Sequence, residues 1–366
     1  MTFDYSFKSW EQTGNLSREL VYFQNFKKKY PSVSFVFLSY GKLEDKQIVK
    51  DLNGIEVIPI YNFLKYNKNK IVRHFRSIFI PFKLSRELKR MDFDVIKQNQ
   101  LQGVWVALIL KFLLKKPLIT RTGYDALQFK IKEKKNIFVI IYYYIITQLA
   151  LWGSNLYTVT SLSDKYFLKK YFLVNKNKIK LRPNFVQQIN LVDIEARAEK
   201  IISVGRLENQ KNINFLISEF KNTDVIIDHY GKGSNENKLK LLSSRENVNI
   251  NFYDNIENSK LLQKYTEYKY FISTSLFEGN PKNILEAMAA GCIVFAPKIS
   301  NVEEIITDNK DGILFELKDG NLLNSFKEIK YNKKIHKPLS NNAVATVKKR
   351  NSLSVLIDNE YQDFIF

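Results

Sequence analysis

The most restrictive feature of the sequence is an alternation of short β-branched or aromatic runs with longer helical stretches. It occurs twice, on either side of a polar segment without periodicity at residues 181–200. Strands that alternate with helices form parallel sheets covered on both faces. The sequence therefore predicts an α/β fold of two doubly wound, Rossmann-like domains that face each other across a cleft. The expected strands are residues 32–40, 55–60, 94–99, 117–122 and 156–160, then 200–205, 224–231, 248–253, 268–274 and 292–297.

Length, cysteine content and the first residues limit the class of protein and the compartment that the sequence allows. Its 366 residues suffice for two separate cores. The single cysteine, Cys292, excludes an intrachain disulfide and fits a reducing cytoplasm. Residues 1–14 lack the basic start and apolar run of a secretory signal.

An uncharged stretch at residues 137–152 is shorter than the roughly 20 residues that a membrane span needs. We expect it to form a helix buried in the amino-terminal core. The alternative is an interfacial helix that uses Tyr142, Tyr143 and Tyr144.

Charge is distributed unevenly between the two halves. The net charge is +20, and all of it lies in residues 1–184, because residues 185–366 hold equal numbers of basic and acidic side chains. A half of this kind is attracted to a polyanion, either anionic lipid or nucleic acid.

Much of this charge lies between residues 65 and 90, where cations are interleaved with apolar side chains. One interpretation is a solvated helix face that covers the amino-terminal sheet. The other is a surface that docks on anionic lipid at the cytoplasmic leaflet. Nucleic acid is disfavoured, because no recognition fold or stacking motif accompanies the segment. The predicted membrane patch comprises Lys65, Arg73, Arg76, Lys83 and Arg86.

The segment STSLFEGNPKNILEAMAAG, at residues 273–291, predicts a strand, a loop and a helix. Asn280 is a suitable N-cap, Pro281 suits the first turn, and Gly291 ends the helix. Backbone amides of a first helical turn lack partners within the helix and can bind an anion such as a diphosphate. The amides expected to do so are those of Lys282, Asn283 and Ile284.

Two glutamates flank this turn. Glu286 lies one turn into the predicted helix, where it could accept hydrogen bonds from the two hydroxyls of a ribose. Glu278, in the loop, could reach the hydroxyls of a sugar. The alternative is a capped helix with two solvated glutamates.

Two further loops follow predicted strands. After the strand that ends at Gly205, Arg206 and Lys211 could clamp a diphosphate, or they could be ordinary surface cations. Gly231 and Gly233 would allow a ligand to approach the backbone closely, or they could form a plain turn.

In this order and spacing, residues 180–316 resemble the donor-binding domain of the retaining glycosyltransferases of family four, which have the GT-B fold. The resemblance rests on GRLENQK (205–211), EGNPKNILEAMAAG (278–291) and NVEEIITDNKDGILF (301–315). RPNFV (182–186) is similar to the junction between the two domains of that family.

The resemblance implies a role for each of these residues. Arg206 and Lys211 would hold the diphosphate of a nucleotide sugar, Glu286 the ribose and Glu278 the transferred sugar. Gly279, Asn280 and Pro281 would complete the donor site. We expect UDP or GDP as the carrier, with no separate cofactor. It also implies an acceptor domain at 1–184, a donor domain at 185–345 and a last helix at 346–366 that returns to the first domain.

The amino-terminal half departs from the family pattern. In WEQTGNLSREL (10–20) only Gly14 stands where a glycine pair is usual, and only MTFDYSFKS comes before it in place of the usual apolar first strand. LITRTGYD (118–125) replaces a histidine of many members, so Arg121, Tyr124 and Asp125 become acceptor-site candidates. We expect His74, His229 and His336 to be non-catalytic. No Cys/His cluster suggests zinc, and we expect no bound metal.

The resemblance thus implies a retaining, metal-independent glycosyltransferase, and the basic half favours a cytoplasmic protein that is peripheral at the inner membrane. Its acceptor would be a glycan or lipid-linked glycan for lipopolysaccharide, capsule or a similar polymer. One alternative is a sugar-nucleotide epimerase or hydrolase on the same fold. Another is a basic membrane-binding or nucleic-acid-binding protein with a degenerate donor site.

Overall fold

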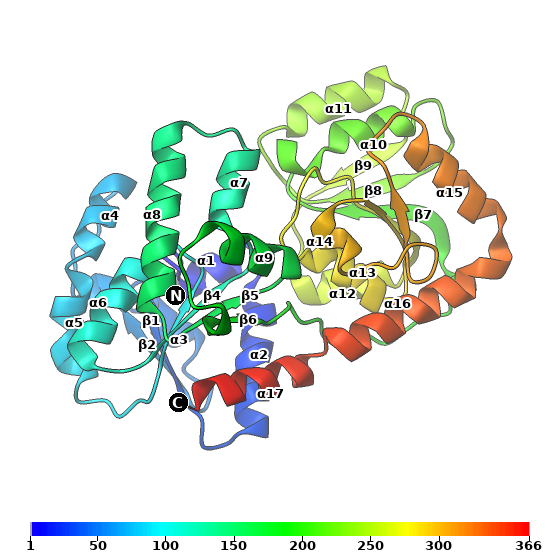
Figure 1. Cartoon of the computed structure of the whole chain (residues 1–366). Helices are drawn as coiled ribbons and strands as arrows, with labels where there is room; N and C mark the ends of the chain where they lie inside the picture. The colour runs from blue at the N-terminus through cyan, green and yellow to red at the C-terminus, as the bar shows by residue number, and fades with distance from the viewer. Residues whose placement is uncertain (1, 366) are drawn as a thin grey trace. The chain divides into compact units, whose positions relative to one another are not determined.

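A computed structural model describes residues 2–365 as two compact units (Figure 1). The first unit comprises Met1–Arg182 and Ile357–Phe366, and the second comprises Pro183–Leu356. The chain enters the second unit between Arg182 and Pro183, two residues before the boundary expected from the sequence, and it returns within its last helix.

A six-stranded parallel sheet forms the centre of the second unit, with the order β12-β11-β10-β7-β8-β9. The first strand in the chain, β7, is therefore central. This is the strand order of doubly wound nucleotide-binding sheets. The strands are β7 (Ala198–Val204), β8 (Ile227–Tyr230), β9 (Ile250–Tyr253), β10 (Tyr268–Ile272), β11 (Ile293–Pro297) and β12 (Ile313–Phe315).

Helices cover this sheet and bury two apolar clusters. Phe271 of β10 belongs to one cluster and its neighbours Tyr270 and Ile272 to the other, because successive side chains of a strand point to opposite faces. The helices are α10 (Ile213–Glu219), α11 (Glu236–Arg245), α12 (Asn258–Tyr265), α13 (Lys282–Ala289), α14 (Ser300–Glu303), α15 (Asn321–Tyr331) and α16 (His336–Arg350). Short 3-10 turns are η3 (Ile194–Ala196), η4 (Asn209–Lys211) and η5 (Lys333–Ile335).

The first unit contains two parallel sheets. Strands β1 and β2 pair only with each other, and a second sheet has the order β3-β4-β5-β6. The described residues of this unit therefore do not form a single doubly wound sheet. The strands are β1 (Phe35–Ser39), β2 (Ile55–Pro59), β3 (Ile96–Asn99), β4 (Leu118–Thr122), β5 (Leu156–Val159) and β6 (Ile179–Leu181).

Each of the ten predicted strands overlaps an observed one, and β6 and β12 were not predicted. Both have three residues, which is too short for a periodic pattern to stand out. They join their sheets through ladders to β5 and β11, contacts that become visible only in the folded chain.

The helices of the first unit surround both of its sheets (Figure 1). They are α1 (Phe7–Gln12), α2 (Leu16–Lys29), α3 (Glu44–Ile48), α4 (Lys70–Ser77), α5 (Ile80–Leu88), α6 (Val104–Leu114), α7 (Ala126–Lys132), α8 (Ile137–Gly153) and α9 (Leu162–Tyr171), with 3-10 turns η1 (Ile60–Asn62) and η2 (Lys176–Lys178). The predicted burial of residues 137–152 is wrong for one face of α8. Tyr143, Ile146 and Leu151 are buried, whereas Phe138 and Trp152 are exposed.

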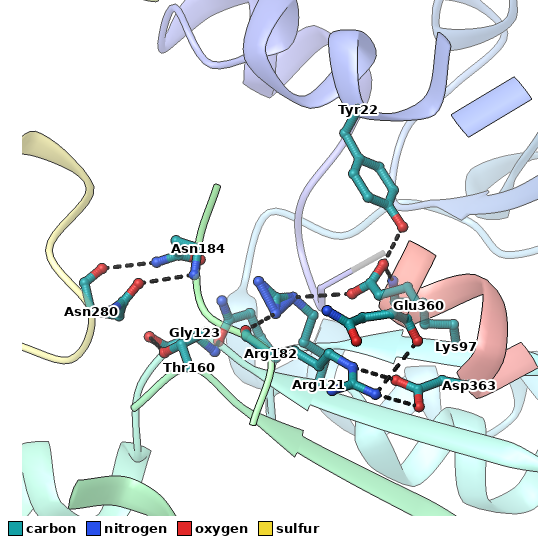
Figure 2. Close-up of polar contacts among 12 residues, drawn as sticks. Tyr22, Lys97, Arg121, Gly123, Thr160, Arg182, Asn184, Asn280, Glu360 and Asp363 are labelled. Atoms are coloured by element: carbon teal, nitrogen blue, oxygen red, sulfur yellow. Dashed lines mark hydrogen bonds and ion pairs between the residues drawn. The ribbon is translucent and has the colours of Figure 1, made fainter. Parts of the chain in front are cut away.

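The last helix, α17 (Leu353–Phe364), begins later than the predicted helix at 346–366, because α16 continues to Arg350. Two acidic side chains hold α17 to the first unit (Figure 2). Glu360 accepts hydrogen bonds from the Tyr22 hydroxyl and, at 2.6 Å, from Lys97 Nζ. Asp363 accepts from the Arg182 guanidinium at 2.7 and 2.8 Å.

Glu360 is almost completely buried, and burial alone would raise the pKa of its carboxyl. The positive charges of Lys97 and Arg121 outweigh burial, so the pKa lies below its ordinary value. The carboxylate is therefore charged, and Lys97 depends on it as a buried partner.

We predict that Glu360→Gln lowers the free energy of unfolding of the first unit by about 3 kcal/mol, because it leaves the largely buried Lys97 ammonium without its carboxylate partner. The matched control is Asp358→Asn on the same helix, which removes an exposed pair with Lys29 and should cost less than about 1 kcal/mol. Urea unfolding can be followed by tryptophan fluorescence, since Trp10, Trp105 and Trp152 all lie in the first unit. Equal losses in both variants would contradict the prediction.

Candidate functional site

The candidate site lies where the strand order of the second unit reverses. From β7 the chain moves to β8 and β9 on one side, and β10 lies on the other side of β7. At such a point, the loops after two neighbouring strands run in opposite directions and leave a crevice at the carboxyl edge of the sheet. Ligands of parallel α/β sheets usually bind in this crevice. The loops here are residues 205–212 after β7 and 273–281 after β10.

Hydrogen bonds join these two loops directly. Thr274 Oγ1 donates to the carbonyl oxygens of Lys211 and Asn212, at 3.0 and 3.1 Å. Gln210 Nε2 donates to the Phe277 carbonyl at 2.9 Å, and the Gln210 carbonyl accepts from the Leu276 amide at 2.9 Å. The position of Lys211 is thereby tied to that of Glu278.

An ion pair joins Lys211 and Glu278 across the loops. Lys211 Nζ lies 2.5 Å from Glu278 Oε1, and the two side chains are 16% and 8% exposed. The stem of Lys211 crosses Gly205, where an added Cβ would lie 3.1 Å from the Lys211 side chain. The sequence predicted both residues as site members, and the structure adds that they contact each other.

Arg206 is exposed, next to Gly205 and outside the Lys211–Glu278 pair. Its role in diphosphate binding stays a prediction.

Gly231 and Gly233 approach protein backbone. An added Cβ at Gly231 would lie 2.1 Å from the Gly205 carbonyl oxygen, and one at Gly233 would lie 2.4 Å from that of Leu207. The loop after β8 thus packs on the loop after β7. This packing explains both glycines without a ligand, and it supports the loop after β7.

The predicted cap of α13 is wrong. Pro281 occupies the N-cap position, and no side chain caps the helix. The Asn280 side chain instead accepts a hydrogen bond from the Asn184 amide at 2.9 Å, and the Asn280 carbonyl accepts from Asn184 Nδ2 at 2.8 Å (Figure 2). Asn280 therefore fixes the loop to the segment that opens the second unit, a contact over 96 positions.

Gly291 ends α13 as predicted. It has a φ of 74°, and its amide and that of Cys292 donate to the Met288 and Ala287 carbonyls. This is the hydrogen-bond pattern of a Schellman motif.

Asn283 occupies part of the first turn of α13. Asn283 Oδ1 accepts from the Ile284 amide at 3.0 Å, and Asn283 Nδ2 donates to the Val204 carbonyl at 2.8 Å. Asn283 therefore links α13 to the end of β7, and the Ile284 amide is engaged. For Lys282 and Asn283, the predicted anion-binding role of the amides stays a prediction.

Glu286 is buried, at 6% exposure, and accepts a hydrogen bond from Asn258 Nδ2 at 3.0 Å. Glu278 is buried as well, so the alternative of two solvated glutamates is wrong. Asn258, the first residue of α12, was not predicted as a site residue, because nothing near it in the chain marks a polar partner. A buried glutamate on an otherwise apolar helix face was the available signal.

His229 supports the loop after β7. Its Nε2 lies 3.0 Å from the Gly205 carbonyl and its Nδ1 lies 3.2 Å from Ser203 Oγ, and the ring is fully buried. Burial lowers the pKa of His229 to about 4, the bond to Gly205 opposes the shift, and the charge of Lys211 adds to it. The neutral ring therefore holds the Gly205 carbonyl in position by donating a hydrogen bond to it.

The described contacts do not bring the acceptor-site candidates of the first unit together in one cluster. Arg121 donates to the Arg182 carbonyl at 3.1 Å and pairs with Glu360, so it helps to hold α17. Tyr124 is partly exposed and packs on the Phe129 ring. Gly14, with a φ of 70°, lies between α1 and α2. Their roles at an acceptor stay predictions.

Asp125 is buried and caps α7 by accepting from the Gln128 amide at 2.7 Å. Burial raises the pKa of Asp125 to about 7, although the amide bond opposes the shift. The cap gives this carboxyl a structural role.

The predicted membrane patch divides into two kinds of cation. Arg73 binds Asp4 through two nitrogens and is largely buried, so it is a structural residue of the first unit. The other members, Lys65, Arg76, Lys83 and Arg86, are exposed.

Among residues 2–365, no group of three or more His, Cys, Asp or Glu side chains is placed to hold a metal ion. Asp92 and Asp94 form an Asp-x-Asp triplet, which precedes β3 at the amino end of that strand. Within the same described range, no helix combines the length and apolar character needed to span a bilayer.

Comparison with known proteins agrees with this geometry. Residues 188–346 match the model of the family described as "Glycosyl transferases group 1". These comparisons support a glycosyltransferase. The match covers both loops, the ion pair and α13.

Two relatives have names that refer to polysaccharide or lipid-linked glycan synthesis. The capsular polysaccharide biosynthesis glycosyltransferase CapH of Staphylococcus aureus is 28% identical, over 66% of this chain and 70% of its own. An N-acetylgalactosaminyltransferase of Campylobacter jejuni, whose name specifies a diphospho-undecaprenol glycan as acceptor, is 26% identical over 52% of this chain. The chain spans only 55% of that relative.

A solved structure covers nearly the whole chain. HepE of Anabaena, in complex with UDP and glucose, aligns over 94% of each chain with a TM-score of 0.73 and 15% identity. This likeness confirms the predicted α/β fold with parallel sheets as that of GT-B glycosyltransferases.

We predict that His229 makes the second unit lose stability as the pH falls. The unfolded chain takes up a proton near pH 6.5, but the folded ring does so only near pH 4. The contribution is therefore complete above about pH 6.5 and is lost towards pH 4, a change of about 3 kcal/mol.

His229→Gln keeps a donor and an acceptor but does not titrate. Hydrogen exchange of the buried β8 amides at pH 4.5 and pH 7.5 should show a smaller pH effect in this variant than in the wild type. The same pH effect in both proteins would overturn the assignment.

Proposed function

We propose that the protein is a retaining, metal-independent glycosyltransferase that uses a nucleotide sugar, with UDP or GDP as the carrier. Its acceptor is a glycan or lipid-linked glycan of a capsule, a lipopolysaccharide or a similar polymer, at the cytoplasmic face of the membrane. The observation that carries the proposal is the Lys211–Glu278 pair at the strand-order reversal, with Glu286 buried on the helix that follows.

The pair suits a site that receives a diphosphate. Without a ligand, each largely buried charge needs the other, because an unpaired charge away from water is costly. A bound diphosphate would supply Lys211 with a second anionic partner and leave Glu278 oxygen atoms for sugar hydroxyls. Glu286, with Asn258 on one oxygen, would accept bonds from the ribose.

The reaction that follows from this arrangement needs no protein nucleophile. The bond between the sugar C1 and the diphosphate oxygen breaks, and the acceptor hydroxyl oxygen forms a bond to C1 on the same face of the sugar. The hydroxyl proton passes to the departing phosphate oxygen. Lys211 and Arg206 would stabilise the charge that develops on the leaving diphosphate.

We predict that substitutions at the ion pair separate binding from turnover. Lys211→Ala should weaken UDP or GDP binding by ~10–100-fold, the usual effect of losing a charge-assisted hydrogen bond. Glu278→Gln should bind the bare nucleotide as tightly as the wild type or more tightly, because it removes a negative charge, while turnover falls by ~100-fold.

Isothermal titration and initial rates provide the two readouts for these variants. Lys318→Ala, an exposed lysine of the same unit, is the control that should change neither. Normal binding by Lys211→Ala would contradict the diphosphate role of this lysine.

We predict that Glu286→Ala reduces sugar transfer by ~100-fold or more and weakens nucleotide binding, with the fold of the second unit retained. Product analysis of UDP and GDP sugars, with and without a glycan acceptor, measures the effect. Unchanged turnover in both Glu286→Ala and Lys211→Ala would refute the site. Sugar release or epimerisation without acceptor consumption would favour a hydrolase or an epimerase, and no nucleotide binding at millimolar ligand would favour a degenerate donor site.

A further inference from the structure

Helix α8 exposes large apolar side chains and buries polar ones. Phe138 is 80% exposed and Trp152 is 56% exposed, whereas Thr147 and Gln148 are buried. Gln148 is satisfied inside the unit, because its side chain donates to the Leu173 carbonyl at 2.8 Å and accepts from the Leu173 amide at 3.1 Å. A surface helix normally has the opposite arrangement.

The exposed side chains of α8 form one continuous stripe. They recur every three or four positions, the spacing that places helical residues on a common face. Residues 137–153 contain no charged side chain. The stripe consists of Ile137, Ile141, Ile145, Leu149 and Trp152, with Phe138, Tyr142 and Tyr144 beside it.

A second apolar segment lies next to this stripe, on α4 and α5. The His74 ring of α4 lies 6.3 Å from the Tyr142 ring of α8, and Trp105 of α6 donates to Ser77 at the end of α4. These helices neighbour one another in Figure 1. The exposed apolar residues of this segment are Ile71, Phe75, Ile78, Phe79 and Phe82.

Exposed cations accompany both segments. Arg76, Lys83 and Arg86 lie on α4 and α5 among the apolar side chains, and Lys134 and Lys135 directly precede α8. The first 184 residues carry the whole net charge of +20. Apolar side chains with cations around them match the acyl boundary and the anionic headgroups of a bilayer.

We infer that α8 and the α4–α5 segment form one docking surface for an anionic lipid bilayer, with α8 lying in the plane of the interface. The apolar stripe enters the headgroup boundary, Trp152 and the tyrosines lie at the level of the headgroups, and the cations contact lipid phosphates. Attachment therefore depends on α8 insertion as well as on the basic segment, and it does not require an occupied donor site.

The test is flotation of the full-length protein with vesicles of phosphatidylcholine alone and with added phosphatidylglycerol. The variant Phe138→Gln/Ile141→Gln/Ile145→Gln changes only exposed positions of α8. We expect the wild type to float with the anionic vesicles and the triple variant to bind them at least ~10-fold more weakly. Raised salt should weaken wild-type binding without abolishing it, because insertion is not screened.

Leu241→Gln, at a residue of the second unit that is 74% exposed, is the matched control and should bind vesicles as the wild type does. UDP or GDP binding, measured by titration without lipid, should be unchanged in the triple variant. This titration distinguishes a loss of nucleotide binding from a loss of vesicle binding. Equal flotation of triple variant and wild type would overturn the inference. So would no wild-type flotation, or a wild-type dimer that the triple variant converts to a monomer, since the stripe would then bind a second copy.

Discussion

The strand order of the second unit is the constraint on which the rest of the site depends. Parallel hydrogen bonding places β10 beside β7, although 63 residues of chain separate the end of one strand from the start of the other. The loops that follow both strands therefore meet at one edge. Thr274 and Gln210 then fix the two loops to each other. Without that register, Lys211 and Glu278 would be two unrelated surface charges.

Much of the remaining polar chemistry of the second unit supports this edge. His229 and the two glycines of the β8 loop hold the Gly205 turn from one side. Asn283 connects α13 to the end of β7, and Asn280 binds Asn184. A reaction in which charge develops on a diphosphate requires groups that are already in position. Such a site need not rearrange when the charge appears.

The first unit combines a polar anchor with an apolar surface. The acidic residues of α17 bind Lys97 and Arg182, which are largely buried, and those contacts return the last helix to the unit in which the chain began (Figure 2). Its exposed helices present large apolar side chains among cations, at a solvation cost that a membrane would relieve. The cations of this half therefore fall into two groups. Arg73 and Lys97 form ion pairs within the fold, whereas Arg76 and Lys83 are exposed.

The sequence by itself determined the elements whose signals are local. The ten longer strands, the turn at Gly291 and the order of the candidate-site loops follow from periodicity and from the chemistry of single residues. Only the tertiary structure decided what depends on contacts distant in the chain. It gave Asn280 a partner 96 positions away in place of a helix cap, divided the amino-terminal strands between two sheets and turned the apolar side of α8 outward. The physical reason is that hydrogen-bond partners and buried faces are selected by the packing of whole elements, which no short window of sequence contains.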